Sequence, residues 1–298
     1  MRVFVTGATG NIGSNVVKEL IAAGHQVIGL CRSDDKVPAL AATGAEVYRG
    51  SIADPDSLKE GAARSDGVIH LAFNHDFSRF VQNCEDDRRV IETLGSTLAG
   101  TNRPLIVTSG TGMSRTGADQ IALETDPPAS SKRVPRAASE EAADAVAEHG
   151  VRVSVVRLAQ IHDRAKHGLV SPAIQIAQAR GISAYVGDGL NRWPAAHRLD
   201  TAHLYRLVLE KGEANARYNA VAEEGITFRE IAEAIGETLK LPVVRLDPKD
   251  AETHFGWLAA FVALDIPASS ARTREQLGWH PTGPDLLSDL RNMKPSEN

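Results

Sequence analysis

The sequence predicts an α/β protein: a doubly wound parallel sheet followed by a smaller C-terminal lobe. In the first 160 residues, short runs rich in Val and Ile alternate with longer amphipathic stretches. The apolar runs mostly lack polar alternation, as expected of strands that are covered on both faces. Such alternation of strands and helices produces a parallel sheet with right-handed crossovers. After about residue 160 this rhythm breaks, which predicts a separate, smaller lobe.

The expected elements follow from these runs and from the caps between them. Strands are expected at residues 3–6, 26–30, 45–48, 67–71, 105–108 and 151–157. Helices are expected at residues 12–23, 55–64, 78–98 and 137–149. In the second half we expect a helix near 171–180, a loop over 181–197, a strand at 217–222 and a helix at 227–239. Thr227 and Glu230 have the spacing of a capping box. Residues 251–284 show little periodicity, and residues 294–298 have the character of a frayed tail.

Composition argues against several classes of function. The 298 residues carry a formal net charge of −5 and no basic block, so no nucleic-acid partner is expected. The two cysteines, Cys31 and Cys84, lack metal-ligand spacing and cannot form a disulfide framework. We therefore expect no metal and a cytoplasmic location. No apolar segment approaches the roughly 18 residues of a membrane-spanning helix, and the N-terminus lacks the features of a signal peptide.

The strongest motif is TGATGNIG at residues 6–13, directly after the first expected strand. In this pattern Gly7 makes the tight turn, Gly10 lets the backbone approach a pyrophosphate, and Gly13 permits close packing of helix and strand. The N–H groups and dipole of the following helix then bind the phosphates. An ordinary turn between strand and helix is the alternative, but the further β-α units favour a dinucleotide site. The contacts are expected from Gly7, Thr9, Gly10, Asn11 and Ile12.

The end of the second strand indicates which dinucleotide binds. An NAD site usually has an acidic residue here that accepts from the ribose 2′-hydroxyl. This chain has Arg32, which can pair with a 2′-phosphate, and Ser33, which can add a hydrogen bond. These residues favour NADP(H) over NAD(H). The alternative is that Arg32 is solvated and that Asp34 or Asp35 contacts the ribose.

These motifs predict a Rossmann-type dinucleotide-binding domain over residues 1–160. Residues 161–298 are expected to form a smaller substrate-capping lobe, with segments that return to the Rossmann core.

The same motifs resemble those of the extended or atypical short-chain dehydrogenase/reductases, the NAD-dependent epimerase/dehydratase-like group. TGATGNIG resembles the family's T-G-x-x-G-x-x-G loop, and residues 50–54 resemble its segment beside adenine, although Ser51 replaces the usual Asp. His-Leu-Ala at 70–72, Val-Val-Arg-Leu at 155–158 and the segment 193–200 match later parts of the family pattern. The resemblance implies further cofactor contacts from Ser51, Ile52, Leu71, Ala72, Thr108 and Leu158.

One departure from the family bears on catalysis. The family carries Tyr-x-x-x-Lys, in which Tyr exchanges a proton with substrate and Lys holds the nicotinamide ribose. The four tyrosines here, at positions 48, 185, 205 and 218, have no Lys four residues later. The family also has a Glu four residues after that Lys. If Glu140 takes this place, Arg136 stands in the Lys position and Lys132 in the Tyr position.

Three side chains are therefore candidates for catalysis. Ser109 resembles the family's serine-bearing segment and could hydrogen-bond a substrate oxygen, with Thr111 as the alternative. A capped strand end explains Ser109 equally well. Arg136 could hold the ribose but is a poor proton relay, because it stays charged. Lys132 or a water could supply the proton, although a solvated helix start is the commoner role for Lys132 and Arg136.

Two regions are candidates for substrate contact. Phe73 and His75 follow the fourth strand, where doubly wound sheets bind ligands. His75 could donate a proton, although an exposed loop histidine is the commoner outcome. Tyr185 lies in an expected glycine-rich loop and is a candidate lid or substrate contact.

The first hypothesis for function is an NADPH-dependent reductase of a small ketone or aldehyde, in which Ser109 polarises the carbonyl. A cofactor-binding sensor that has lost catalysis is the second, and a nucleotide-sugar epimerase or dehydratase is the third. The resemblance also implies a homodimer through the helices expected at 78–98 and 137–149, although packing within one chain would explain the same helices.

Overall fold

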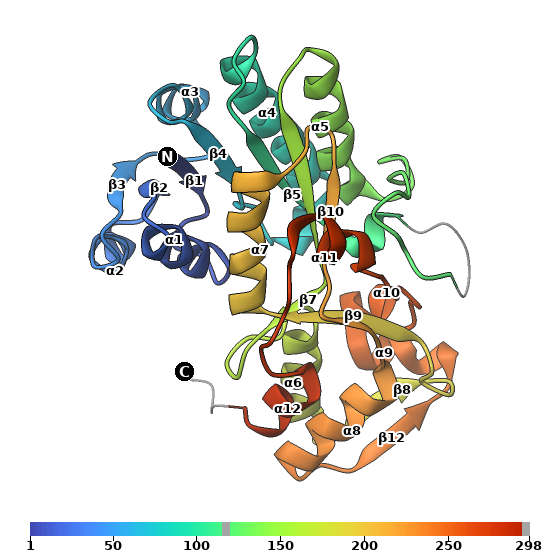
Figure 1. Cartoon of the computed structure of the whole chain (residues 1–298). Coiled ribbons are helices and arrows are strands. Elements are labelled where there is room, and N and C mark those ends of the chain that lie inside the picture. The colour runs from blue at the N-terminus through green and yellow to red at the C-terminus, as the bar shows by residue number, and fades with distance from the viewer. Residues whose placement is uncertain (115–119, 294–298) are drawn as a thin grey trace.

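The computed structural model describes residues 1–114 and 120–293, and its centre is a seven-stranded parallel sheet (Figure 1). The strand order is β10-β6-β5-β4-β1-β2-β3. The bounds are Arg2–Thr6 (β1), Gln26–Cys31 (β2), Glu46–Arg49 (β3), Gly67–His70 (β4), Leu105–Gly110 (β5), Val153–Leu158 (β6) and Arg217–Ala220 (β10). The order reverses between β1 and β4, which places the ligand crevice of this topology at their carboxyl ends.

Burial on both faces explains why the strand sequences lack alternation. In β1, Val3 and Val5 belong to one apolar cluster, whereas Phe4 belongs to another, and all three are 0% exposed. Helices α1 (Gly13–Ala22) and α7 (Arg198–Lys211) contribute to the first cluster. Helices α3 (Pro55–Ala63), α4 (Phe80–Leu98) and α5 (Ala138–Glu148) contribute to the second. The protein is therefore a three-layer α/β/α structure, as the sequence predicted.

Four helices of the core bear on the sequence prediction. Helix α7 was not expected, yet it packs beside α1, and a short helix, α2 (Val37–Ala41), follows β2. Helices α4 and α5, the expected dimer helices, lie side by side in one chain. Pairing between two copies stays a prediction.

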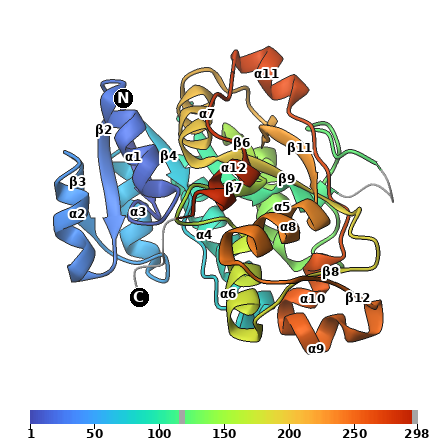
Figure 2. The same cartoon turned by 90° about the horizontal axis from the view of Figure 1, so that it is seen from below.

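Most of the C-terminal elements gather at one end of the sheet (Figure 1), whereas α11 (Ala271–Leu277) packs beside β10 and α7. One small sheet has the order β11-β9-β7, with strands Glu223–Thr227, Arg192–His197 and Gln160–His162, and a second pairs β8 (Ser183–Val186) with β12 (Val243–Leu246). The helices are Val170–Arg180 (α6), Phe228–Leu239 (α8), Ala251–Phe255 (α9), Ala259–Val262 (α10), Ala271–Leu277 (α11) and Leu286–Arg291 (α12). Figure 2 shows α8, α9 and α10 on the opposite side of the molecule from β1, β2 and β3.

Several expectations for this half are corrected or confirmed. The expected loop over residues 181–197 is wrong, because it contains β8 and β9. Gly181, Gly187 and Gly189, all with positive φ, lie around these strands and give the segment the sequence character of a loop. The capping box of Thr227 and Glu230 is confirmed at the start of α8. Strand β10 pairs with β6 in the main sheet, so the chain returns to the core after residue 160. The division at residue 160 stays a prediction, and the expected tail at 294–298 lies outside the described residues. In the described part of the chain, no helix is long and apolar enough to cross a membrane.

Candidate cofactor and substrate site

The glycine loop between β1 and α1 leaves no room for side chains at two positions. A Cβ on Gly13 would lie 2.0 Å from the Gly7 carbonyl oxygen. A Cβ on Gly7, whose φ is +69°, would lie 2.8 Å from the Ala72 nitrogen. The Ile12 N-cap supplies no side-chain acceptor to the first turn of α1. A tight backbone cradle in front of a helix N-terminus fits the pyrophosphate of a dinucleotide.

Thr6 ties this loop to the segment after β4. Its hydroxyl oxygen accepts the N–H groups of Leu71 at 3.2 Å and Ala72 at 3.3 Å, and it lies 2.7 Å from His70 Nδ1. Because these two bonds occupy both lone pairs, the hydroxyl proton is donated to His70 Nδ1. His70 Nε2 therefore carries the ring proton and donates to Asp87 at 2.9 Å.

Asp87, on α4, is the centre of a buried polar network. It is 3% exposed and accepts from His70, from Arg136 Nη1 at 2.8 Å and from Ser139. Burial alone would raise the pKa of Asp87, but the charge of Arg136 and the contact with His70 lower it to about 2. The carboxylate therefore stays ionised and balances the charge of Arg136.

Arg136 is held at the carboxyl ends of β4 and β5. It lies in the 3-10 turn η4 (Pro135–Ala137), and its Nη2 donates to the Thr108 carbonyl at 3.0 Å. The guanidinium carbon is 4.1 Å from the ring centroid of Phe73, and the side chain is 15% exposed. The Thr108 hydroxyl donates to the His70 carbonyl at 2.7 Å, and the Tyr205 hydroxyl lies 2.7 Å from it. A fixed cation thus occupies the edge of the sheet where this topology binds ligands.

Ser109 belongs to a different, structural network. It is 4% exposed, and its hydroxyl donates to Glu140 at 2.8 Å. Glu140 also accepts from Arg157 at 2.9 and 2.7 Å and from Arg217 at 2.9 Å. Burial alone would raise the pKa of Glu140, but these arginines lower it. The single proton of Ser109 is therefore committed to Glu140. This contact agrees with the strand-end explanation, and the role of Ser109 at a substrate carbonyl stays a prediction.

The other catalytic candidates occupy less central places. Lys132 is exposed in a turn, and helical structure begins only at Pro135. Lys132 and Arg136 therefore do not share a helix, as the Tyr-x-x-x-Lys register would require. The Thr111 hydroxyl is buried and lies 3.4 Å from the Leu158 carbonyl oxygen, which ends β6.

The adenine side has an exposed arginine next to paired carboxylates. Arg32 follows β2 and makes no ion pair within residues 1–114 and 120–293. Asp34 lies 2.7 Å from Arg49, and Asp35 lies 3.5 Å from Lys36. Both carboxylates that could accept a hydrogen bond from an NAD ribose thus have cationic neighbours. The guanidinium of Arg32 has no such ion pair in the described residues.

The remaining predicted cofactor contacts lie in loops after the strands. Ser33 precedes the 3-10 turn Asp34–Lys36. Ser51 and Ile52 follow β3, and the Ser51 hydroxyl accepts from the Ala53 N–H at 3.2 Å.

Phe73 and His75 also lie near Arg136, in the loop after β4. Their rings are 5.2 Å apart and meet edge to face. His75 is exposed in this loop, and partial desolvation followed by the charge of Arg136 lowers its pKa. Tyr185 is not with them: it lies in β8 rather than a loop, 9% exposed within the apolar core of the C-terminal lobe, with Arg229 over its ring.

Sequence reasoning missed Asp87 and the bridging role of His70. Asp87 lies 17 residues beyond His70 and 49 before Arg136, on a helix with many charged residues. No local spacing distinguishes it from Asp86 beside it. Trp257 approaches the loop after β4 from the C-terminal lobe and stacks on Phe77.

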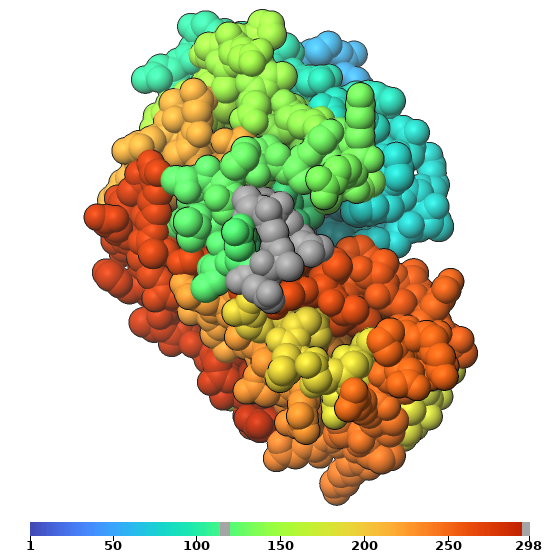
Figure 3. All heavy atoms as spheres, turned by 90° about the vertical axis from the view of Figure 1, so that its right-hand side faces the viewer, coloured from blue at the N-terminus to red at the C-terminus, as the bar shows by residue number. Residues whose placement is uncertain are grey.

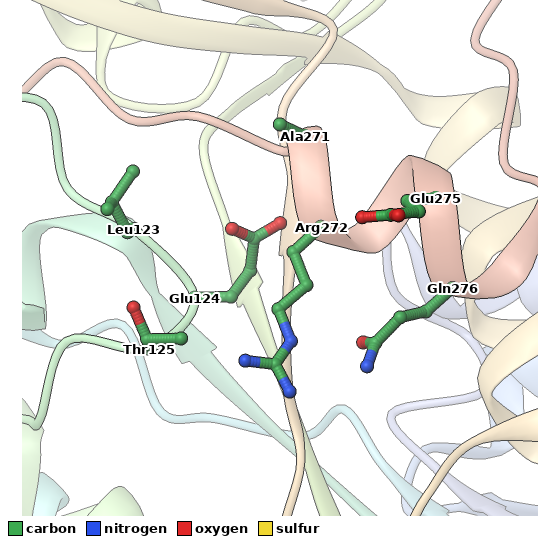
Figure 4. Close-up of a pocket in the computed structure, with 7 residues that line it drawn as sticks. All are labelled: Leu123, Glu124, Thr125, Ala271, Arg272, Glu275 and Gln276. Carbon is green, nitrogen blue, oxygen red and sulfur yellow. The ribbon is translucent and has the colours of Figure 1, made fainter.

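A separate hollow of about 650 Å³ lies between the segment 123–125 and α11 (Figure 4). Glu124 there accepts from the Thr273 N–H at 2.8 Å and so fixes the start of α11. None of the residues lining this hollow is a predicted site residue.

Comparison with known proteins identifies the family. Residues 7–181 match the family model described as NAD(P)H-binding. The chain belongs to this NAD(P)H-binding family. It is 46% identical to an uncharacterized protein of Schizosaccharomyces pombe, over 97% of this chain and 98% of that protein. It is 29% identical to a UDP-glucose 4-epimerase of Streptomyces lividans (95% and 92%) and 27% identical to a 2′-dehydrokanamycin reductase of Streptomyces kanamyceticus (81% and 68%).

A solved structure agrees with the fold of this NAD(P)H-binding protein. A dTDP-glucose 4,6-dehydratase from Streptomyces venezuelae, with NAD bound, has a TM-score of 0.77 at 21% identity, over 98% of this chain and 95% of that one. The predicted α/β fold and the resemblance to extended short-chain dehydrogenase/reductases are confirmed. The chain is therefore an NAD(P)H-binding protein whose fold matches that of this dehydratase.

Proposed function

We propose that this protein is an NADP(H)-dependent oxidoreductase that reduces a small ketone or aldehyde by hydride transfer, without the family's Tyr–Lys pair. The observation that carries the proposal is the fixed cation Arg136, held by Asp87 and the Thr108 carbonyl beside the cofactor loop. A bound dihydronicotinamide would supply the hydride. A positioned cation stabilises the negative charge that develops on the carbonyl oxygen.

Arg136 suits charge stabilisation better than proton transfer. A guanidinium has five N–H donors in a rigid fork and stays protonated in proteins. Two of its nitrogens are anchored to Asp87 and Thr108, which fixes its plane. In this proposal the substrate oxygen accepts a remaining N–H, and solvent water supplies the proton that completes the alcohol.

Cofactor preference rests on Arg32. Arg32 is exposed and makes no ion pair in the described residues, so its guanidinium can pair with a 2′-phosphate. The 2′-dehydrokanamycin reductase among the relatives supports carbonyl reduction as a chemistry of this family.

Single-turnover oxidation of NADPH by a panel of aldehydes and ketones tests the proposal. Arg136→Met is expected to lower the rate about 100-fold or more, as loss of one preorganised donor does. Arg136→Lys, which keeps the charge, should retain part of the rate. Arg133→Met, which removes an exposed arginine three residues earlier, is the matched control and should change little. Equal rates for Arg136→Met and the control would overturn the role of Arg136.

A second candidate, a cofactor-binding sensor, is favoured by the missing Tyr-x-x-x-Lys motif and by the commitment of Ser109 to Glu140. Tight NADPH binding without turnover of any compound in the panel would support it. Addition of UDP-glucose and dTDP-glucose to the panel tests the epimerase or dehydratase alternative, which the Streptomyces lividans relative suggests.

A further inference from the structure

Five aromatic side chains form a contiguous cluster where the loop after β4 and α4 meet the C-terminal lobe, which we call the aromatic wall: Phe73, Phe77, Phe80, Trp257 and Phe261. The rings of Phe80, Phe77 and Trp257 form a stack, with centroids 5.6 and 4.5 Å apart and interplanar angles of 22° and 17°. Phe73 meets Phe80 edge-on, and Phe261 meets Trp257 edge-on. Figure 3 shows the cyan residues after β4 next to the orange residues of the C-terminal lobe on one face.

The wall begins at the cofactor loop. Ala72 donates its N–H to Thr6 and lies against Gly7, and Phe73 is the next residue. The ring of Phe73 lies beneath the guanidinium of Arg136 at 4.1 Å. A carbonyl group bound at Arg136 would therefore have the rest of its molecule beside the wall. The far end of the wall is Trp257, in the 3-10 turn η6 (Gly256–Leu258) of the C-terminal lobe.

Much of the indole of Trp257 is exposed to solvent, unlike the indoles of the other two tryptophans. It is 46% exposed, whereas Trp193 and Trp279 are 0% exposed. A ligand that covers this indole removes apolar surface from water. An aromatic ligand gains more than an aliphatic one of equal size, because offset or edge-on ring contacts add to the burial of area.

We propose that the aromatic wall selects flat aromatic carbonyl compounds as substrates, with Trp257 as a specificity-determining residue contributed by the C-terminal lobe. This inference rests on the proposed reductase function. In the reaction, the carbonyl carbon accepts a hydride from the dihydronicotinamide, the π electron pair moves onto oxygen, and a solvent proton completes the alcohol as the cofactor is oxidised. The wall does not take part in these steps; it holds the ring of the substrate.

The first test compares benzaldehyde with cyclohexanecarbaldehyde, which are similar in size but differ in their rings. The measured quantity is the ratio of their kcat/KM values, compared between native protein and variants, so that intrinsic reactivity cancels. Trp257→Ala is expected to lower this ratio about three- to tenfold, and Trp257→Phe should largely retain it. Leu199→Ala, at a leucine 56% exposed on α7, is the control and should leave the ratio unchanged. An unchanged ratio in Trp257→Ala would overturn the proposal.

A second test does not need turnover. Benzamide and cyclohexanecarboxamide are titrated calorimetrically into the protein saturated with NADP+. Native protein should bind benzamide several-fold more tightly, and Trp257→Ala should lose this preference. If no aldehyde is reduced but the preference for benzamide depends on Trp257, the ligand selectivity of the aromatic wall is supported and the reductase function is overturned. If aldehydes are reduced but neither assay shows a dependence on Trp257, the reductase function stands and the wall is overturned.

Discussion

The phosphate end and the reactive end of the site are built in different ways. At the phosphate end, residues 6–13 form a contiguous loop whose shape depends on the absence of side chains at Gly7 and Gly13. At the reactive end, Arg136, Asp87 and His70 come from three separate elements and are held by charge and hydrogen bonds. Substitutions at the phosphate end should therefore act through steric overlap. Substitutions at the reactive end should act by leaving a buried polar or charged group without its partner.

The largest effect is expected from Asp87→Ala. This change leaves the guanidinium of Arg136 without its counter-charge and His70 Nε2 without its acceptor. Removal of one partner of a buried ion pair costs about 3–5 kcal/mol. The free energy of unfolding, measured by urea at pH 7, should fall by that amount. Asp86→Ala, at the exposed neighbour that pairs with Arg89, is the control and should cost below about 1 kcal/mol.

The same variant has a defined dependence on pH. The folded pKa of Asp87 is lowered to about 2 from an ordinary 3.8. A carboxyl with a depressed folded pKa contributes stability above its unfolded pKa and loses it as the pH falls through the folded value. The deficit of Asp87→Ala should therefore stay constant from pH 7 to pH 5 and shrink only below about 3.8. A deficit that shrinks already between pH 7 and pH 5 would contradict the ionised pair.

The phosphate end is tested by Gly13→Ala. A Cβ there would lie 2.0 Å from the Gly7 carbonyl oxygen, so the loop must open. We expect the Kd for NADPH, measured by fluorescence titration, to rise by about 100-fold, or about 2.7 kcal/mol. Gly112→Ala provides the control, since its Cβ would have its first contact at 4.0 Å. Retention of native affinity by Gly13→Ala would mean that this cradle does not bind the dinucleotide.

Ser109→Ala distinguishes the hydrogen-bond network around Glu140 from the network around Asp87. Ser109 donates to the buried, ionised Glu140, and hydrogen bonds to charged groups contribute about 1.5–3 kcal/mol. The free energy of unfolding should fall by that amount, while kcat changes less than about threefold. A large loss of kcat with unchanged stability would restore Ser109 to the role at the carbonyl that the sequence suggested.

This contrast between regions also explains what the sequence could predict. The strands of the main sheet and the glycine loop depend on local patterns, and the structure confirms them. The hydrogen-bond partner of Ser109 depends on which face of β5 the residue occupies. Neighbouring residues of a strand point to opposite faces. Thr108 accordingly meets Tyr205 and His70, whereas Ser109 meets Glu140. A resemblance in sequence does not determine that one-residue difference.

Contacts between residues far apart in the sequence could not be predicted, for a related reason. Register placed Arg136 in the position of the family's lysine, but the acid that holds it lies 49 residues earlier. Helix α7 was overlooked because part of its polar face pairs with α1: Arg206 and His203 both contact Glu19. Such pairing becomes visible only when the two helices are placed side by side.

The smallest effect is expected from Arg32→Ala, which tests cofactor choice at the phosphate end. Arg32 is exposed and makes no ion pair in the described part of the chain, so its removal disturbs no packing. An exposed contact with a 2′-phosphate should contribute about 1.4 kcal/mol, or tenfold in the Kd for NADPH. The Kd for NADH should not change, since NADH has no 2′-phosphate. Lys36→Ala, which removes an exposed cation beside Asp35, should affect neither. If native protein binds NADH more tightly than NADPH, the two carboxylates near Arg32 contact the ribose instead, and this part of the phosphate end is an NAD site.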